Sequence, residues 1–363
     1  MIPWAKPCLF GNEKDLVMDA LQSTWISGGE YVDRFEKDFA GTIGTKYAVT
    51  TSNGTTALHL ALLALEVGPG DEVIVPDFTF VACANTVLYT GAIPVYVDID
   101  PRTWCIDPEE VENAISRRTK AIIPVHLYGN VCDMEALTDI SKKHDLFLIE
   151  DVAEALFSKY RGRYAGSFGD VSCFSFQATK TITMGEGGAV LTDDKRLMER
   201  MRILRSHGMR EGKRYWHDFV GYNYRLTNMQ AALGCAQFEK KNLLITEKKR
   251  IYERYRDNLS DMEGIELQYI AKEVEPVIWA IALKIDPEYF KGEREFLIKE
   301  LLRRGIETRP GFYPFSVMPI YDAPSFPVAE SVGRNVLSLP SFPFITDAEI
   351  DYICEQMRDL RIE

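Results

Sequence analysis

Residues 51–58 place small and hydroxyl-bearing side chains directly before a helical pattern. The stretch reads TSNGTTAL. Free backbone N–H groups at a helix start, together with the helix dipole, form a site for an anion. Simple N-capping of the same helix by Thr55 would account for these residues equally well. From this stretch alone, both an anion site and a capped helix stay open.

An acidic pair, Glu150 and Asp151, ends the apolar stretch at 146–151. In an open α/β sheet, ligands bind beyond the carboxyl ends of the strands, so this pair is well placed to meet one. The two acids could pair with a cation, bind a metal ion or cap the next helix. Capping is the default role of an isolated aspartate in such a place.

Lys180 follows the next apolar stretch at 171–176 and precedes the glycine-rich sequence GEGG at 185–188. A single lysine is usually a surface charge. In chain order, however, the sequence offers an anion-binding helix start, a strand-end carboxylate and an amine in a flexible region. Pyridoxal phosphate needs an anchor for its phosphate, a partner for its ring nitrogen and a lysine that forms a Schiff base. Together the three stretches predict a pyridoxal phosphate site.

The elements that would position these residues alternate between strand and helix. Apolar, β-branched runs predict strands at 72–76, 93–98, 121–126, 146–151, 171–176 and 189–192. Helical patterns fall between them at 55–65, 107–114, 134–143 and 195–206. This alternation is typical of a layered α/β domain with a mostly parallel sheet. The nearly continuous apolar run at 121–126 indicates a strand covered on both faces.

The character of the sequence changes near residue 245. Residues 238–259 form a charged helical stretch, which we interpret as a solvated helix. Beyond it we predict a strand at 277–285, a helix at 293–304, a proline-rich segment at 310–327 and a closing helix at 347–360. With 363 residues, the chain is expected to form a large domain over 1–245 and a small C-terminal domain over 246–363.

Composition and charge exclude several classes of function. Lys and Arg number 42 against 54 Asp and Glu, a net charge of −12 that opposes binding along a nucleic acid backbone. No apolar run approaches the roughly 18 residues of a membrane span, and the N-terminus lacks the apolar core of a signal peptide. Seven scattered cysteines without a C-x-x-C pair suit reduced thiols in the cytoplasm. The histidines and cysteines have no metal-ligand spacing, so we expect no metal site.

The common nucleotide-binding motifs do not fit either. The sequence contains no G-x-x-x-x-G-K-[ST], and the glycine clusters at 68–70 and 185–188 each lead into a predicted strand. A dinucleotide fingerprint follows a strand and opens a helix. A nicotinamide-dependent sugar oxidoreductase is therefore not supported.

The sequence resembles the fold type I, pyridoxal-phosphate-dependent sugar-nucleotide aminotransferases along most of its length. Within that family the enzymes that form GDP-perosamine are the most similar. The stretches that carry the resemblance are TWIS at 24–27, NGTTALHLAL at 53–62, GPGDEVIVP at 68–76, PVHLYG at 124–129, ED at 150–151, FSF at 174–176, Lys180 with GEGG at 185–188, RYW at 214–216 and GYNYR at 221–225. The resemblance implies a large domain with a seven-stranded mixed, mostly parallel sheet, and a smaller C-terminal α+β domain.

The resemblance also implies roles for the catalytic residues. Lys180 would bind the cofactor covalently and shuttle the proton, and a lysine here favours transamination over the dehydration performed by relatives with histidine. Asp151 would keep the pyridine nitrogen protonated. Glu154 would meet the cofactor's phenolic oxygen; the alternative is an acid that complements the helix dipole in the first turn.

Further cofactor contacts follow from the same resemblance. Gly54 and Thr55 would offer backbone N–H groups to the phosphate, and Ser175 its hydroxyl. Asn223 would reach the phosphate from a second subunit, which implies a homodimer with shared active sites. Phe80 would stack on the pyridine ring; the alternative is a core phenylalanine. His126 and His207 lie in matching segments and are interpreted as structural hydrogen-bonding residues.

The implied reaction moves the amino group of L-glutamate to the C4 ketone of a nucleotide-linked 4-keto-6-deoxy sugar. GDP-4-keto-6-deoxy-D-mannose, which would give GDP-perosamine for polysaccharide or O-antigen biosynthesis, is the first choice. Ser27, Tyr313 and Ser316 are expected at the substrate. QAT at 177–179 replaces the usual Phe-Gly-Asn, and Ser316 replaces a usual histidine, which leaves open a UDP- or dTDP-linked sugar. A more distant alternative is a non-catalytic regulatory protein on the same fold.

Overall fold

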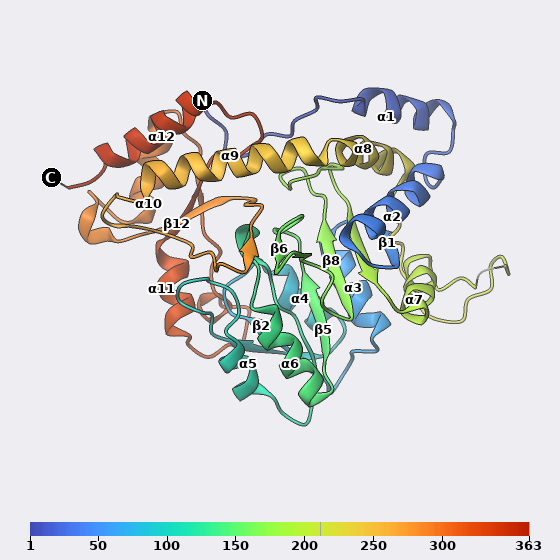
Figure 1. The fold of residues 1–363 in the computed structure, drawn as a ribbon. Helices are drawn as coiled ribbons and strands as arrows, with labels where there is room; N and C mark the ends of the chain where they lie inside the picture. The colour runs from blue at the N-terminus through green and yellow to red at the C-terminus, as the bar shows by residue number, and fades with distance from the viewer. Residues whose placement is uncertain (211, 363) are drawn as a thin grey trace.

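A twisted seven-stranded sheet forms the centre of the N-terminal two thirds of the chain (Figure 1). The computed structural model describes residues 1–210 and 212–362. The strand order is β1-β9-β8-β5-β4-β2-β3. Its strands are β1 (Tyr47–Thr51), β2 (Glu72–Pro76), β3 (Ile93–Val97), β4 (Thr119–Ile122), β5 (Phe147–Asp151), β8 (Val171–Ser175) and β9 (Gly188–Thr192). All neighbours pair in parallel except β9, which is antiparallel to β1 and β8, so the mixed, mostly parallel sheet is confirmed.

Within the large sheet, β4 is clearly shorter than predicted and the first strand, β1, was not predicted. The strand expected at 121–126 ends at Ile122, although the Val125 backbone still bridges to Asp151. The unpredicted strand is β1, whose C-terminal half is Thr-rich and reads as polar. Burial of Thr50 is possible because its N–H and its hydroxyl both donate to Glu36 Oε1 at 2.8 Å. A contact with an acid on another helix is not visible in the local pattern.

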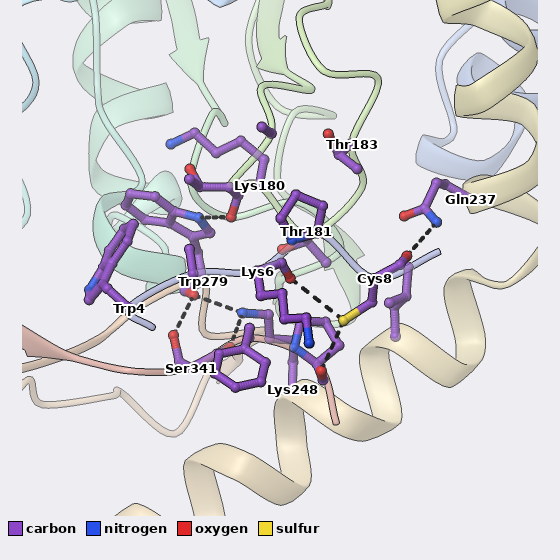
Figure 2. Close-up of a pocket in the computed structure, with 17 residues that line it drawn as sticks. Trp4, Lys6, Cys8, Lys180, Thr181, Thr183, Gln237, Lys248, Trp279 and Ser341 are labelled. Carbon is purple, nitrogen blue, oxygen red and sulfur yellow. Dashed lines mark hydrogen bonds between the residues drawn. The ribbon is translucent and has the colours of Figure 1, made fainter. Parts of the chain in front are cut away.

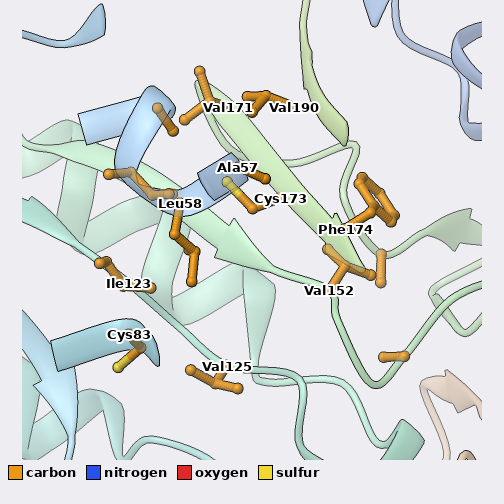
Figure 3. Packing of buried hydrophobic residues seen from close by; sticks show 14 of the residues in the cluster. Ala57, Leu58, Cys83, Ile123, Val125, Val152, Val171, Cys173, Phe174 and Val190 are labelled. Carbon is orange, nitrogen blue, oxygen red and sulfur yellow. The ribbon is translucent and has the colours of Figure 1, made fainter. Parts of the chain in front are cut away.

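Helices cover the faces and edges of this sheet. They are α1 (Glu13–Gln22), α2 (Glu30–Ile43), α3 (Gly54–Ala64), α4 (Ala82–Tyr89), α5 (Pro108–Ala114), α6 (Met134–His144), α7 (Lys195–Arg205) and α8 (Asn228–Glu239). Ala57 and Leu58 of α3 face the β8 side chains in the core (Figure 3). Because α3 is apolar almost all round, it is buried along its length, which fixes its N-terminus at the carboxyl end of the sheet.

The C-terminal part of the chain is organised around a second, antiparallel sheet with the order β10-β12-β14-β13. Its strands are β10 (Ile265–Leu267), β12 (Ile281–Ile285), β13 (Arg309–Pro310) and β14 (Val336–Leu339). The accompanying helices are α9 (Lys241–Leu259), α10 (Arg294–Arg303), α11 (Pro327–Asn335) and α12 (Asp347–Asp359), with short 3₁₀ turns η2 (Pro287–Tyr289) and η3 (Phe315–Val317). A separate apolar cluster that includes Ile251, Leu297 and Ile353 fills the space between them.

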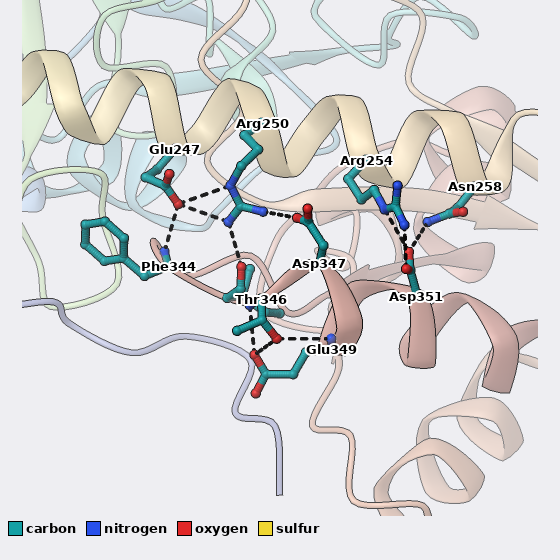
Figure 4. A network of polar contacts seen from close by, with 10 residues as sticks. Glu247, Arg250, Arg254, Asn258, Phe344, Thr346, Asp347, Glu349 and Asp351 are labelled. Atoms are coloured by element: carbon teal, nitrogen blue, oxygen red, sulfur yellow. Dashed lines mark hydrogen bonds and ion pairs between the residues drawn. The ribbon is translucent and has the colours of Figure 1, made fainter.

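Helix α9 is not simply a solvated charged helix. Arg254 pairs with Asp351, and Arg250 with Asp347, so its polar face is joined to α12 (Figure 4). Another face is buried and carries Lys248. The predicted boundary at 245 falls inside this continuous helix, and the division into 1–245 and 246–363 stays a prediction.

Smaller elements link the two sheets. A three-stranded sheet contains β6 (Lys159–Tyr160), β7 (Arg163–Tyr164) and β11 (Val274–Glu275), and η1 (Leu127–Gly129) follows β4. The chain start returns to the C-terminal part, where the Ile2 backbone bridges to Ile306. Among residues 1–210 and 212–362, no helix is long and apolar enough to cross a membrane.

Candidate active site

A cavity of about 750 Å³ opens beyond the carboxyl ends of the large sheet. The start of α3, the segments after β2, β5 and β8, and the C-terminal segment around 309–313 form its walls. This is the place where an open α/β sheet binds ligands. Gly54, Thr55, Phe80, Asp151, Glu154, Ser175, Lys180 and Tyr313 are the predicted site residues that line it.

The start of α3 and the end of β8 form a narrow anion cradle, made of Gly54, Thr55 and Ser175. A Cβ atom on Gly54 would lie 2.8 Å from the Ser175 Cβ, so only glycine allows this approach. The cap of the helix is Asn53 and not Thr55: its side chain accepts the Thr56 N–H at 2.9 Å. Among the described residues, capping engages the Thr56 N–H and leaves those of Gly54 and Thr55 for a ligand in the cavity. Helix dipole, free N–H groups and a hydroxyl together suit a phosphate.

Asp151 is the member of the acidic pair that reaches the cavity. Glu150 is fully buried and accepts N–H groups from Gly166, Phe168 and Gly169, each at 2.7 Å. Asp151 Oδ1, by contrast, accepts the Ala153 N–H at 3.0 Å. Burial raises the pKa of Asp151, because the charged form is poorly solvated. A cationic partner would stabilise that charged form.

Glu154 and Lys180 face each other across the inner end of the cavity. Lys180 Nζ lies 3.5 Å from Glu154 Oε1, while Glu154 Oε2 accepts the Tyr128 N–H at 2.9 Å. Burial lowers the pKa of Lys180, and the Glu154 and Asp151 carboxylates act in the opposite direction. Burial also raises the pKa of Glu154, against the influence of Lys180. A lysine poised between these effects is a candidate nucleophile and base.

A tight turn presents Lys180. The Lys180 N–H donates to the Gln177 carbonyl at 2.8 Å, and Gln177 Oε1 accepts both the N–H and the hydroxyl of Thr179, at 2.8 and 2.7 Å. QAT at 177–179 thus forms its own hydrogen-bonded turn in place of the Phe-Gly-Asn expected from the resemblance.

Phe80 is not a core residue. It is 55% exposed, lines the cavity and lies 5.9 Å from the Phe312 ring, which agrees with a stacking surface for a planar ligand. His126, in contrast, is fully buried: its Nε2 lies 3.0 Å from Glu150 Oε2, and its Nδ1 accepts the Cys132 N–H. His207 lies outside the cavity, and its Nε2 is 3.4 Å from Arg225 Nη2.

Three predicted residues do not line the cavity within this chain: Ser27, Asn223 and Ser316. Ser27 is exposed. Asn223 is also exposed, and its Oδ1 accepts the Arg225 Nε–H at 3.1 Å. Ser316 donates to Asp77 and does not line the cavity, and its contact with the substrate stays a prediction.

The cavity also contains residues that sequence reasoning missed: Trp4, Tyr128, Trp279, Arg309 and Phe312. Trp4 and Arg309 are far apart in the sequence. Only tertiary folding brings the Arg309 Cζ atom to 5.5 Å from the centroid of the Trp4 ring. For Tyr128 a local signal was present, because it stands in a matching segment directly before Gly129. Its backbone adopts a left-handed conformation, with φ of 58°, which costs conformational energy for a residue other than glycine.

The sequence profile of the DegT/DnrJ/EryC1/StrS aminotransferase family matches residues 7–358. The chain belongs to this family. It is 45% identical over 99% of its length to a GDP-perosamine synthase from Escherichia coli O157:H7, covering 98% of that protein. It is 44% identical over 96% of its length to a GDP-perosamine synthase from Caulobacter vibrioides, covering 95% of that protein. The putative sugar aminotransferase Spr1654 from Streptococcus pneumoniae, in its pyridoxamine phosphate (PMP) form, superposes with a TM-score of 0.94 at 30% identity, with 99% and 97% of the two chains covered.

Membership of this family makes the chain a pyridoxal-phosphate-dependent sugar aminotransferase. The residues present fit the cofactor. A phosphate fits the anion cradle that a Cβ on Gly54 would fill, and the buried Asp151 carboxylate suits a protonated ring nitrogen. Lys180 supplies the amine, and the exposed face of Phe80 supplies a surface for the ring.

Proposed function

We propose that this aminotransferase moves the amino group of L-glutamate to the C4 ketone of GDP-4-keto-6-deoxy-D-mannose, giving GDP-perosamine. The observation that supports this choice is the 45% identity to a GDP-perosamine synthase, which extends over nearly the whole of both chains. The enzyme would serve surface-polysaccharide biosynthesis in the cytoplasm.

The proposed roles of the site residues follow from their places in the cavity. When bound, pyridoxal phosphate supplies an electron sink for the loss of a proton from the carbon that bears the amino group. Lys180 Nζ would take that proton, hold it and return it. Asp151 would hold a proton on the ring nitrogen by its negative charge, because an adjacent anion favours the cationic form. Gly54, Thr55 and Ser175 would bind the phosphate.

Glu154 would act on Lys180 as well as on the cofactor. Its carboxylate lies within 3.5 Å of Nζ and is fixed by the Tyr128 N–H. It favours the charged amine, so it would stabilise Lys180 in the interval in which Nζ carries the transferred proton. Glu154 would also meet the phenolic oxygen of the cofactor.

Arg309 would meet an anionic group of one of the two substrates. Among residues 1–210 and 212–362, it contributes the guanidinium that lines the cavity, and its side chain is 58% exposed. Both the carboxylates of glutamate and the diphosphate of the nucleotide sugar are suitable partners. Tyr313, which is 51% exposed on the same wall, would contact the sugar substrate.

We also propose a homodimer with shared active sites. Asn223 is exposed and outside the cavity of its own chain, as expected for a residue that serves a second subunit. Large apolar side chains are exposed at the end of α4 and on the 210s segment, among them Tyr89, Trp216 and Phe219. A second copy of the chain would cover them.

A single-turnover measurement tests the reaction and the substrate separately. The purified enzyme is converted with L-glutamate to the pyridoxamine phosphate form, freed of amino acid, and mixed with GDP-4-keto-6-deoxy-D-mannose while the cofactor absorbance is followed. Return of the initial spectrum with GDP-perosamine in the product supports the proposal. Conversion by glutamate without return would reject this sugar, and a panel of UDP- and dTDP-linked keto sugars would then identify the substrate. A protein that takes up no cofactor would contradict the assignment as an active enzyme.

A further inference from the structure

Trp279 is the aromatic residue in closest contact with Lys180. It lies in the segment before β12, is 7% exposed, and lines the same cavity. The Lys180 Nζ atom lies 3.6 Å from the centroid of the indole. At this distance, the electron-rich face of an aromatic ring attracts an ammonium group.

The same indole also holds the backbone beside Lys180. Its Nε1–H donates to the Thr179 carbonyl at 2.7 Å. The face of the ring therefore contacts the Lys180 side chain, and its edge binds the preceding residue. These two contacts fix the ring relative to the turn that presents the lysine.

The backbone of Trp279 is anchored from the opposite side (Figure 2). Its N–H donates to the Tyr128 carbonyl at 2.9 Å. Its carbonyl accepts the Lys248 ammonium at 2.9 Å and the Ser341 hydroxyl at 3.1 Å. The Trp4 ring packs edge-on at 5.6 Å. Trp279 is thus hydrogen-bonded at both backbone groups and at its indole N–H.

The surroundings of Nζ contain charges of both signs. The carboxylates are those of Glu154, whose Oε1 lies 3.5 Å from Nζ, of Asp151 at the end of β5, and of Glu186, which also lines the cavity. The cations are Arg309 on the cavity wall and Lys6 and Lys248 along a small adjoining cavity, which Cys8 also lines. Lys180 is only 13% exposed, so water solvates its ammonium poorly. In such surroundings the indole face contributes more than it would in water.

We propose that Trp279 is a catalytic residue: its indole face binds the Lys180 ammonium while that amine is free of the cofactor, and keeps Nζ beside the reacting carbon. The inference rests on the proposed role of Lys180 as the proton-transferring amine. Nζ takes a proton and becomes charged, then gives the same proton up and becomes neutral. The indole acts in the interval between these steps, and Glu154 acts with it.

The test measures the pKa of Lys180 in the full-length chain freed of its cofactor. Acetylation of Lys180 by acetic anhydride is followed by mass spectrometry as a function of pH, because only the neutral amine reacts. Loss of the cation–π contact in Trp279→Leu removes a stabilisation of the charged amine. The pKa of Lys180 should therefore fall by about 0.5 to 1.5 units, with acetylation near pH 7 about 3- to 30-fold faster. Trp279→Phe, which keeps an aromatic face, should shift it by less than half as much.

A purely structural role predicts the opposite sign. If the indole served only to exclude water, its removal would solvate the ammonium and raise the pKa of Lys180. A rise, or no shift, in Trp279→Leu would overturn the proposal. Tyr269→Leu is the matched control, because the Tyr269 ring centroid lies 3.8 Å from the Arg102 guanidinium carbon in a cation–π contact outside the cavity, so the pKa of Lys180 should stay unchanged.

Fluorinated tryptophan keeps the test informative if Trp279→Leu does not fold. Fluorine withdraws charge from the ring face with little change in shape, so 5-fluoro- and then 5,7-difluorotryptophan should lower the pKa of Lys180 stepwise. A constant pKa across this series would contradict the proposal. The readout involves no sugar, so a wrong sugar assignment would fail the single-turnover experiment without changing this result.

Discussion

Ser316 binds Asp77 at two points. The Ser316 N–H donates to Asp77 Oδ1 at 2.9 Å, and its hydroxyl donates to Oδ2 at 2.7 Å, between residues 239 positions apart. Asp77 directly follows β2 and opens the segment that carries Phe80, while Ser316 lies in η3, just after Tyr313. The contact therefore joins two walls of the cavity, and we expect Ser316 to influence the substrate through the position of these walls.

Removal of the Ser316 hydroxyl should loosen the Tyr313 wall more than the segment that carries Phe80, because the Asp77 N–H stays bonded to the Val97 carbonyl. Ser316→Ala loses one hydrogen bond to a buried carboxylate, which is worth about 1–2 kcal/mol of unfolding free energy. We expect KM for the sugar to rise several-fold, with little change in the half-reaction with glutamate. Steady-state kinetics with both substrates provide the measurement. Ser316→Thr keeps the hydroxyl and should behave like the wild type; equal damage in both variants would contradict this account.

Asp77 should make stability depend on pH in the acidic range. Burial raises its pKa to about 6, and the Ser316 hydrogen bonds only partly offset this rise. Between the ordinary value of 3.8 and about 6, the folded chain binds more protons at Asp77 than the unfolded chain does. The contribution of Asp77 to stability therefore falls as pH rises through this window and is constant above it.

The measurement compares urea unfolding of the wild type and Asp77→Asn. Asparagine cannot ionise, so the difference in unfolding free energy between the two proteins should change by about 2 kcal/mol between pH 4.5 and 7, in the direction that disfavours the wild type at pH 7. A difference independent of pH would show that Asp77 titrates near its usual pKa. Asp139→Asn, on the exposed side of α6, serves as a control with no such dependence.

The local pattern predicted those parts of the site that lie next to strands. Asp151 and Lys180 stand at the ends of apolar runs, and the alternation of strand and helix places such ends at one edge of the sheet. Ser175 also stands at such an end, but Gly54 follows β1, which was not predicted, so their shared role was expected only from the resemblance. The start of α3 was predicted one residue late, because Asn53 and Thr55 are both good capping residues. In the structure Asn53 is the cap, and it forms a capping box with Thr56.

The aromatic and C-terminal walls could not be predicted in this way. Trp279 contacts Lys180 across 99 positions of chain, and no periodicity in its segment distinguishes it from a core residue. Ser316 was assigned to the substrate because of what stands there in relatives, but its partner Asp77 is a buried acid that no local pattern connects with it. Such contacts arise from packing between segments remote in sequence.

Replacement of the proposed proton-transferring amine should abolish turnover. Lys180→Ala removes both the covalent partner of the cofactor and the base, so we expect a loss of at least about 10³-fold in kcat. Loss of the characteristic absorbance of the lysine-bound cofactor should accompany it. Lys249→Ala, an exposed lysine on α9, is the control. Full multiple-turnover activity in Lys180→Ala would contradict the assignment of this lysine.

Asp151→Asn should separate cofactor binding from chemistry. The amide still fits the space and the anion cradle is intact, so much of the cofactor should stay bound. Without the negative charge, the ring nitrogen is no longer held protonated, and kcat should fall about 10²- to 10⁴-fold. Cofactor absorbance after gel filtration gives the binding, and single-turnover rates give the chemistry. Near-normal rates with bound cofactor would rule out this role for Asp151.

Because of Lys248, the free energy of unfolding should rise with pH on the alkaline side of neutrality. It is 3% exposed and donates to two carbonyls, Trp279 at 2.9 Å and Ser341 at 2.7 Å, with no carboxylate among these partners. Burial lowers its pKa from 10.5 to about 7. Between these values the unfolded chain binds more protons at Lys248 than the folded chain, so stability rises with pH across this window.

Lys248→Met removes this dependence while keeping the length of the side chain. The difference in unfolding free energy between wild type and Lys248→Met should move by about 2 kcal/mol in favour of the wild type between pH 7.5 and 9.5. Lys249→Met, its exposed neighbour, should show no such change. Because Lys248 anchors the Trp279 carbonyl, we also expect Lys248→Met to lower kcat several-fold while KM changes little. A flat pH difference would mean that water reaches Lys248 and that the small cavity beside it is open to solvent.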